Sequence, residues 1–186
     1  MIFVTVGNTD PFDRLIRAVE RWSIARTPRE DICAQIGAGE FVPTSFPTDR
    51  FLDPLAFESR FKGAELVISH AGMGTIITAL ELGKPLLVMP KRASLGEQRN
   101  EHQLATVEHV CGKNSIWVAH DEHEFPAVLD RLLGTIRLEN DGITKRGKVP
   151  ASSSLLDFVR AFVHQGAPSS ATDAKRQADQ LGIGNR

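Results

Sequence analysis

Short apolar runs alternate along the chain with longer segments in which apolar residues recur every three or four positions. A run of about five apolar residues predicts a buried strand, and the longer spacing predicts a helix with one buried face. Strands are predicted at residues 2–6, 32–36, 66–68, 85–89 and 115–118, with a brief one near Phe51. Helices are predicted at residues 11–19, 54–61, 75–82, 100–110, 122–133 and 155–165. This alternation predicts a Rossmann-like α/β fold, a parallel sheet with helices on both faces.

The ends of two predicted helices carry clear signals. Asp10 is a favourable N-cap for the first helix, and Pro11 suits its first position. Gly83 ends the helix that Thr75 begins. The buried stripe of the first helix is expected to leave three arginines facing water: Arg14, Arg17 and Arg21.

The periodicity divides the chain into four parts. Residues 1–133 are predicted to form the folded domain, and residues 134–154 a connector rich in Gly, Lys, Arg and Ser. An amphipathic helix is predicted at residues 155–165. Residues 166–186 are polar and poor in aromatic side chains, so a disordered tail is predicted there.

Composition excludes several classes of function. The net charge of −1 and the dispersed basic residues argue against nucleic acid as a partner. Cys33 and Cys111 are the two cysteines, which predicts neither a disulfide framework nor a zinc site and fits a reducing cytosol. No apolar run reaches the roughly 20 residues of a bilayer span, and the first residues lack the basic region of a signal peptide, so a cytoplasmic location is expected.

The segment 66–90 is the strongest candidate for chemistry, because it reads as strand, glycine turn, helix and strand. Gly72 and Gly74 allow a tight turn, and the free N–H groups at the start of the following helix favour an anion. His70 and three hydroxyls from Ser69, Thr75 and Thr78 are expected at the same mouth. A diphosphate held without a metal is the resulting prediction.

Two further loops are expected beside this turn, because ligands of parallel α/β sheets bind beyond the carboxyl ends of the strands. The first spans residues 7–10 and the second residues 90–103. In the second, Lys91 and Arg92 either neutralise a diphosphate or are simply exposed. No third ligand joins the histidines at 102 and 109, so a metal site is not predicted. The chain also lacks the P-loop pattern and the dinucleotide-binding pattern of glycines.

Four stretches, at residues 4–7, 12–16, 69–75 and 100–103, together resemble the donor-binding C-terminal half of the GT-B glycosyltransferases of family 28. The likeness extends to the small catalytic subunit of the two-part GlcNAc transferase of N-glycan assembly and to bacterial exopolysaccharide relatives. It covers residues 1 to about 133, together with the late predicted helix. The resemblance implies a UDP-sugar site with His70 as the catalytic donor. The substrate-binding residues that it implies, or that the turn suggests, are Gly7, Asn8, Thr9, Gly72, Met73, Gly74, Thr75, Thr78, Asn100, Glu101 and Gln103.

The sequence departs from the family pattern at two positions. Gly7-Asn8-Thr9 stands where members often carry Gly-Thr-Thr or Gly-Thr-Ser. Thr78 stands where a larger relative has a glutamate that binds the ribose hydroxyls, which moves ribose recognition elsewhere.

The resemblance also implies a partner, because a GT-B enzyme needs a second Rossmann-like half and too little chain follows residue 133 to build one. In the family this partner is anchored in the membrane and presents a lipid-linked acceptor. The helix at residues 155–165 is the expected docking element, and the chain is expected at the cytoplasmic face of the membrane. The function expected is a metal-independent, cofactor-free UDP-sugar transferase subunit of exopolysaccharide or capsule synthesis. A non-catalytic activator that binds sugar nucleotides, and an epimerase, are the alternatives.

Overall fold

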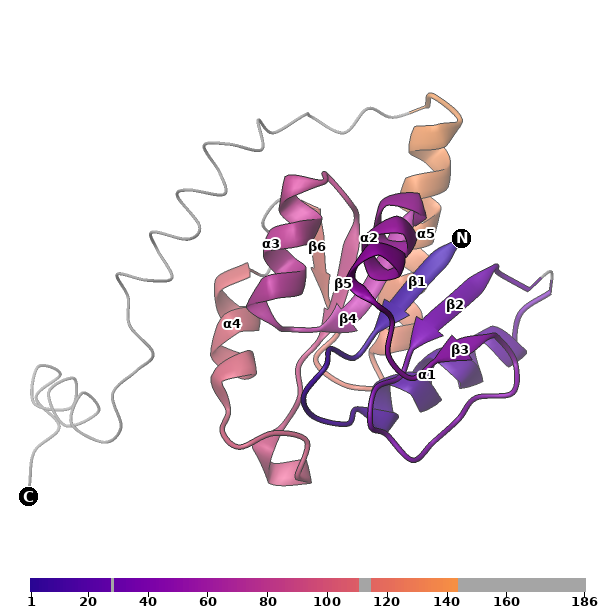
Figure 1. Ribbon diagram of the computed structural model, residues 1–186. Coiled ribbons are helices and arrows are strands. Elements are labelled where there is room, and N and C mark those ends of the chain that lie inside the picture. The colour runs from indigo at the N-terminus through magenta and orange to yellow at the C-terminus, as the bar shows by residue number, and fades with distance from the viewer. Residues whose placement is uncertain (28, 111–114, 144–186) are drawn as a thin grey trace, which may run out of the picture.

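A computed structural model describes residues 1–27, 29–110 and 115–143, which form an α/β domain around one sheet (Figure 1). All of the strand pairs are parallel, and the strand order is β3-β2-β1-β4-β5-β6. The strands are β1 (Ile2–Thr5), β2 (Ile32–Gln35), β3 (Thr48–Asp49), β4 (Leu66–His70), β5 (Leu86–Met89) and β6 (Ile116–Val118). The predicted parallel sheet is therefore confirmed.

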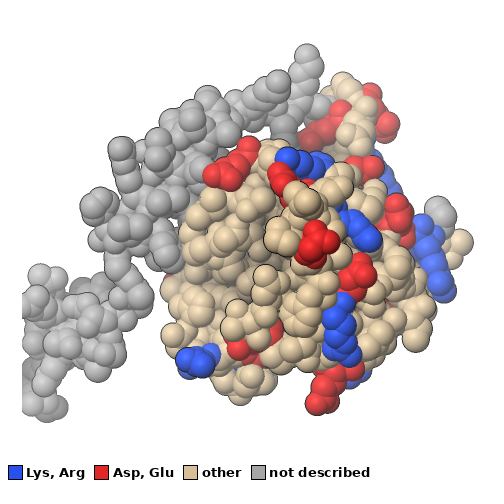
Figure 2. All heavy atoms as spheres, viewed as in Figure 1, with Lys and Arg blue, Asp and Glu red and all other residues tan. Residues whose placement is uncertain are grey.

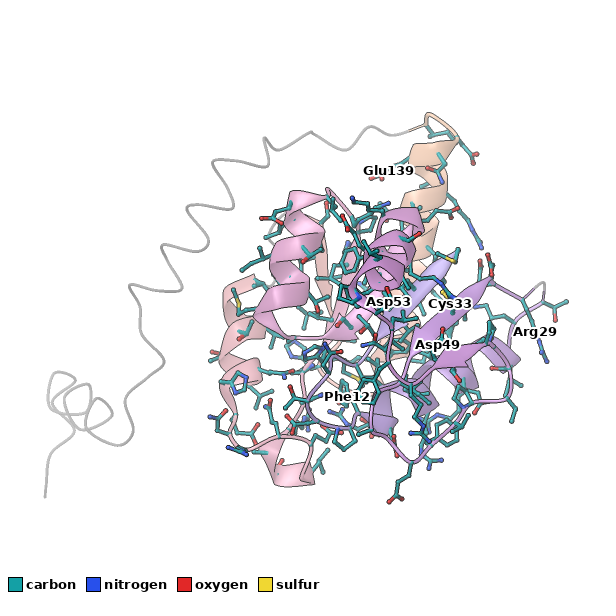
Figure 3. The ribbon with its side chains drawn as sticks, viewed as in Figure 1. Phe12, Arg29, Cys33, Asp49, Asp53 and Glu139 are labelled. Carbon is teal, nitrogen blue, oxygen red and sulfur yellow. The ribbon has the colours of Figure 1, made fainter. Side chains whose placement is uncertain are left out.

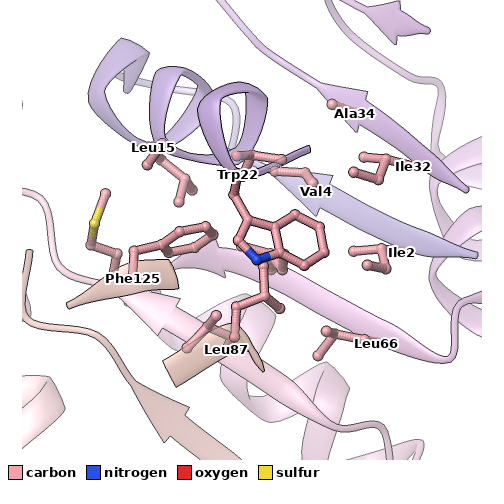
Figure 4. Packing of buried hydrophobic residues seen from close by; sticks show 14 of the residues in the cluster. Ile2, Val4, Leu15, Trp22, Ile32, Ala34, Leu66, Leu87 and Phe125 are labelled. Atoms are coloured by element: carbon pink, nitrogen blue, oxygen red, sulfur yellow. The ribbon is translucent and has the colours of Figure 1, made fainter. Parts of the chain in front are cut away.

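Helices cover both faces of the sheet, as the alternating pattern predicted. They are α1 (Asp13–Ile24), α2 (Pro54–Gly63), α3 (Met73–Glu81), α4 (His102–Val110) and α5 (Phe125–Asn140), with a short 3-10 helix η1 (Ala93–Leu95) before α4. On one face α1 and α5 bury Trp22 and Phe125 against strand residues such as Val4 and Leu87 (Figure 4). On the other face α2, α3 and α4 pack on a second core that includes Phe3 and Val67.

Several predicted element ends are wrong. Asp10 does not cap α1, because the helix begins at Asp13 and Phe12 takes the cap position without a side-chain hydrogen bond. The carboxylate of Asp13 instead accepts hydrogen bonds from the backbone N–H groups of Glu40 and Phe41, both at 3.1 Å. The third strand is Thr48–Asp49, and Phe51 lies beyond it with an exposed side chain.

The last described helix also runs further than predicted. α5 continues from Phe125 to Asn140, so residues 134–140 are helical and do not belong to a connector. The apolar stripe persists through Ile136, which is buried, while Gly134 lies on the exposed face of the helix. The remaining connector, the docking helix predicted at 155–165 and the tail predicted at 166–186 lie outside the described residues. Within the described part of the chain, no helix has the length and apolar character needed to cross a membrane.

Candidate functional site

The candidate site lies at the carboxyl edge of the sheet, where β1 and β4 run side by side. Thr5 and Ser69 are register partners in these two strands. The chain leaves β1 toward α1 on one face and leaves β4 toward α3 on the other. In an open parallel sheet this reversal opens a crevice for ligands, so the loops after β1, β4 and β5 border the candidate site.

The imidazole of His70, the last residue of β4, lies against the two glycine loops. A Cβ atom on Gly7 would lie 2.7 Å from Cε1 of the ring, and a Cβ atom on Gly72 would overlap with Nε2. Gly7 also has a φ of 80°, a conformation that favours glycine. The other ring nitrogen, Nδ1, lies 3.1 Å from Oγ of Ser69. The structure thus brings His70, Gly7 and Gly72 together, as the sequence predicted.

His70 is a neutral donor at physiological pH. The pKa of its imidazole falls from 6.5 to about 4, mainly because the ring is buried and in part because of electrostatic interactions with Lys91 and His102. A neutral imidazole offers one N–H to a ligand but no charge. Any positive potential at this point must come from other groups.

The first turn of α3 supplies donors to the same crevice. Gly72 is the N-cap, and no described side chain caps the N–H groups of Met73, Gly74 and Thr75 that follow it. Unpaired N–H groups at the start of a helix favour an anion. Gly74 is open, because a Cβ atom there would meet nothing within 4 Å. Thr78 lies one turn further on and donates its hydroxyl to the Gly74 carbonyl at 2.9 Å, so the helix itself occupies that donor.

The ammonium group of Lys91 is buried beneath the loop after β1. Lys91 is 2% exposed, and its Nζ donates to the carbonyl oxygens of Val6 at 3.1 Å and Asp10 at 2.6 Å. It also lies 5.6 Å from the centre of the Phe12 ring, which is labelled in Figure 3. Burial lowers the pKa of Lys91, and the charges of Asp10 and Glu97 oppose that shift. Lys91 is therefore neither an exposed charge nor a side chain that reaches into solvent.

The side chain of Gln103 clamps two loops of the site. Its Oε1 accepts hydrogen bonds from the backbone N–H groups of Ala71 at 3.1 Å and Lys91 at 3.0 Å. Gln103 is 5% exposed, and its Nε2 makes no hydrogen bond to any described residue. The main structural role of Gln103 is therefore to hold the loops after β4 and β5 together. Of its side-chain polar atoms, Nε2 is the one available for the predicted contact with the sugar.

Asn100 and Glu101, the other predicted sugar ligands, shape their own segment. Oδ1 of Asn100 accepts a hydrogen bond from the backbone N–H of His102 at 3.3 Å, and Oε1 of Glu101 accepts one from Ser94 at 3.0 Å. Both side chains are exposed. No hydrogen bond between described residues joins either of them to the glycine turn, and their contact with a sugar stays a prediction.

Arg14 does not face water as expected but braces the loop after β5. Its guanidinium donates two hydrogen bonds of 2.8 Å to the carboxylate of Glu97, one of 3.0 Å to Glu122 and one of 2.9 Å to the Pro90 carbonyl. The second Glu97 oxygen also accepts from the backbone N–H of Arg92 at 2.9 Å. A bidentate pair with both side chains 12% exposed is a strong constraint, so α1 fixes the rim of the site.

A pocket of about 280 Å³ adjoins the loop after β1 and is lined by Asn8, Gln35, Leu52, Pro54 and Phe57. Gln35, which is buried in β2, donates to Oδ1 of Asn8 at 2.9 Å and accepts from the backbone N–H of Leu52 at 3.1 Å. The sequence reasoning missed Gln35, although an amide in an otherwise apolar strand is the signal that marks it. Asn8 and Thr9 are both exposed at this rim.

Charged side chains are unevenly distributed over the face of the molecule that Figure 2 shows. Over α3 and α4 the face in Figure 2 is largely free of charged side chains, which gather instead over α2 and the neighbouring edge of the sheet. Among the described residues, no three His, Cys, Asp or Glu side chains lie together as ligands for a metal ion. Backbone N–H groups and the buried Lys91 are groups at the site that favour an anion.

A match to a known family covers most of the chain. The glycosyltransferase family 28 C-terminal domain matches residues 1–147. The chain belongs to this family. Its fold corresponds to one Rossmann-like half of the GT-B glycosyltransferases, as the resemblance in the sequence predicted.

The chain is similar in sequence to named transferase subunits. The chain is 39% identical over 112 residues to the UDP-N-acetylglucosamine transferase subunit ALG13 of Homo sapiens. That alignment covers 55% of this chain and 9% of the human protein. It is 27% identical over 133 residues to ALG13 of Yarrowia lipolytica, which covers 65% of each. The family 28 chain therefore spans less than two thirds of each of these relatives.

Two solved structures share the fold. The glycotransferase of kitacinnamycin aligns with a TM-score of 0.52 at 20% identity, over 86% of this chain and 39% of its own. MurG of Acinetobacter baumannii aligns with a TM-score of 0.52 at 17% identity, over 73% of this chain and 40% of its own. In both cases this family 28 chain corresponds to less than half of the larger protein.

Proposed function

We propose that this chain is the donor-binding subunit of a two-part glycosyltransferase that takes its sugar from a UDP-sugar. The observation that carries the proposal is the convergence of three features at the β1 and β4 ends. These are the uncapped N–H groups at the start of α3, the neutral imidazole of His70 and the buried ammonium of Lys91. Together they offer hydrogen-bond donors and positive potential where a diphosphate fits.

The neighbouring pocket supports a nucleotide rather than a free phosphate. Phe57, Leu52 and Pro54 provide apolar walls, and Asn8 and Gln35 provide amides at one side. Apolar walls with a few placed polar groups are typical of sites for flat organic ligands. A uracil base in this pocket would place the diphosphate toward Gly7 and His70, because Asn8 follows Gly7 directly.

The proposed chemistry is a displacement at the anomeric carbon of the donor sugar. The oxygen of the acceptor hydroxyl forms the new bond, the bond from that carbon to the phosphate oxygen breaks, and the electron pair leaves with UDP. The proton of the hydroxyl passes to a base, which the proposal assigns to the partner. This chain acts on the leaving group, because the α3 amides and the N–H of His70 donate to phosphate oxygens as their charge grows. No metal and no cofactor are part of the proposal.

The acceptor half comes from a partner in this proposal. Both structural relatives are more than twice as long as their matched segments, whereas the described residues form one Rossmann-like half. The ALG13 relatives are named as transferase subunits, which supports a two-part enzyme. The proposed partner is anchored in the membrane and presents a lipid-linked acceptor of exopolysaccharide or capsule synthesis, and it holds this chain at the cytoplasmic face.

A truncation tests the predicted docking element. We expect removal of residues 152–186 to abolish capture by the partner subunit in a pull-down while UDP binding by residues 1–151 is kept. A truncated chain that is still captured with unchanged efficiency contradicts the assignment of residues 155–165 as the docking helix.

Binding and transfer measured on the same variants test the function. We expect UDP to bind the wild-type chain, and His70→Ala to weaken UDP binding and to raise the transfer barrier by roughly 2 to 4 kcal/mol in the reconstituted pair. His120→Ala is the matched control, because the side chain of His120 is exposed and makes no hydrogen bond to a described residue. Normal transfer by His70→Ala, in a complex that assembles and binds UDP, would favour an activator that binds the nucleotide without taking part in catalysis.

A further inference from the structure

The side chain of Ser69 is the buried neighbour of His70 that the proposed chemistry does not use. Ser69 is fully buried in β4, and its Oγ lies 3.1 Å from Nδ1 of the imidazole. This is the hydroxyl's one hydrogen bond among the described residues. The pair has two possible arrangements, because either the hydroxyl or Nδ1 supplies the proton.

The burial of Ser69 decides between the two arrangements. If Nδ1 carried the ring proton, Oγ would accept it, and the hydroxyl's own proton would be buried without an acceptor. A buried donor without a partner is destabilising, and such donors are rare in folded proteins. If the hydroxyl donates to Nδ1, both groups are satisfied and the ring proton is on Nε2.

We propose that Ser69 is a positioning residue that fixes His70 as the tautomer with its proton on Nε2. The pKa of His70, lowered to about 4 mainly by burial, keeps the ring neutral at pH 7, so one ring nitrogen is a donor and the other an acceptor. Nε2 is the ring nitrogen nearer to both glycine loops, because a Cβ atom on Gly72 would overlap with it and a Cβ atom on Gly7 would lie 3.1 Å from it against 3.4 Å from Nδ1. Ser69 therefore turns the donor of the imidazole toward the glycine loops.

The tautomer determines the sign of the interaction with an anion. Nε2–H attracts a phosphate oxygen, whereas a bare Nε2 lone pair at the same position repels it. This consequence rests on the proposed nucleotide site, although the tautomer itself does not. Ser69 is thus expected to act on UDP binding without touching the ligand.

Nitrogen NMR of the full chain at pH 7 reads the tautomer directly, because protonated and bare ring nitrogens have well-separated 15N chemical shifts. His70→Gln identifies the His70 signals. In the wild type we expect a bare Nδ1 and a protonated Nε2. In Ser69→Ala we expect the two shifts to move toward each other, since the two tautomers then exchange, and UDP to bind roughly tenfold more weakly. Ser69→Thr keeps the hydroxyl and suits a strand, so it is expected to keep the wild-type His70 shifts and the wild-type affinity for UDP.

Ser23→Ala is the matched control, because Ser23 is also buried but lies on α1 near the end remote from the site. It is expected to leave the His70 shifts and UDP binding unchanged. A proton on Nδ1 of the wild-type His70, or unchanged His70 shifts in a folded Ser69→Ala, overturns the proposal. If Ser69→Ala does not fold, the wild-type spectrum alone decides. A wild-type protein with Nε2 protonated that does not bind UDP supports the role of Ser69 and refutes the nucleotide site.

Discussion

Substitution of Gly74 by alanine separates the stability of the domain from its affinity for a nucleotide. Gly74 is the second residue of α3, and a Cβ atom there would meet nothing within 4 Å. Gly134 in α5 has the same open surroundings and is also exposed. Because alanine forms helices better than glycine, each change is expected to stabilise the domain by up to about 1 kcal/mol. For a domain of this size that corresponds to a Tm rise of about 2–4 °C.

The two variants should differ when UDP is present. A Cβ atom on a helix points toward the amino end, so the methyl group of Gly74→Ala projects over the proposed diphosphate. UDP at 100 times its Kd stabilises the folded state by about 2.7 kcal/mol, and a tenfold weaker Kd reduces this to about 1.4 kcal/mol. Gly134→Ala should keep the full gain, because it lies on α5 and not in the site.

Thermal melts of the wild type and both variants, with and without UDP, measure these quantities together. Without ligand, both variants are expected to have a higher Tm than the wild type. With UDP, the stabilisation of Gly74→Ala is expected to be about half that of the wild type and of Gly134→Ala. An equal gain from UDP in Gly74→Ala and Gly134→Ala would refute the idea that the diphosphate lies at the amino end of α3.

Three further outcomes follow from the charges around the site. The pKa of His70 is about 4 in the folded state and near 6.5 in the unfolded state, so the free energy of unfolding should fall as the pH drops from about 6.5 to about 4. The fall should be at most about 1.4 kcal/mol per pH unit. Denaturant titrations at several pH values should show a shallower fall in His70→Gln. Glu97→Gln weakens the bidentate pair with Arg14 and should cost about 2 kcal/mol in urea denaturation, whereas Glu58→Gln, in an exposed pair, should cost under about 0.5 kcal/mol. Lys91→Met removes the buried cation and should weaken UDP binding in calorimetry by roughly tenfold, and unchanged binding would exclude an electrostatic role for Lys91.

The strands and the glycine turn were predictable because their signals are local. The apolar residues of β1 and β4 are contiguous, and Gly83 with a φ of 61° ends α3 where a helix-stopping glycine was expected. The same reasoning failed at Gly134. A glycine on the exposed face of a helix costs stability without ending it when Ile136 continues the buried stripe.

The partners of the site's polar side chains were not predictable, because they lie far away along the chain. Arg14 pairs with Glu97, and Lys91 binds the carbonyl of Val6, across 83 and 85 residues respectively. Periodicity shows which face of an element is buried but not which charged group of another element meets it. The sequence therefore predicted where the ligand-binding residues lie in the fold. It did not predict that the side chains of Gln103 and Glu101 accept hydrogen bonds from the backbone N–H groups of Ala71 and Ser94.

The double hydrogen bond accepted by Gln103 has a consequence for how ligands enter. One oxygen atom ties the backbones at Ala71 and Lys91, so these two segments cannot shift independently. The two segments are therefore already ordered in the folded domain, and ligand binding requires little further loss of their conformational entropy. Entry of a ligand should accordingly proceed without a slow rearrangement, and competing ligands should differ mainly in how long they stay bound.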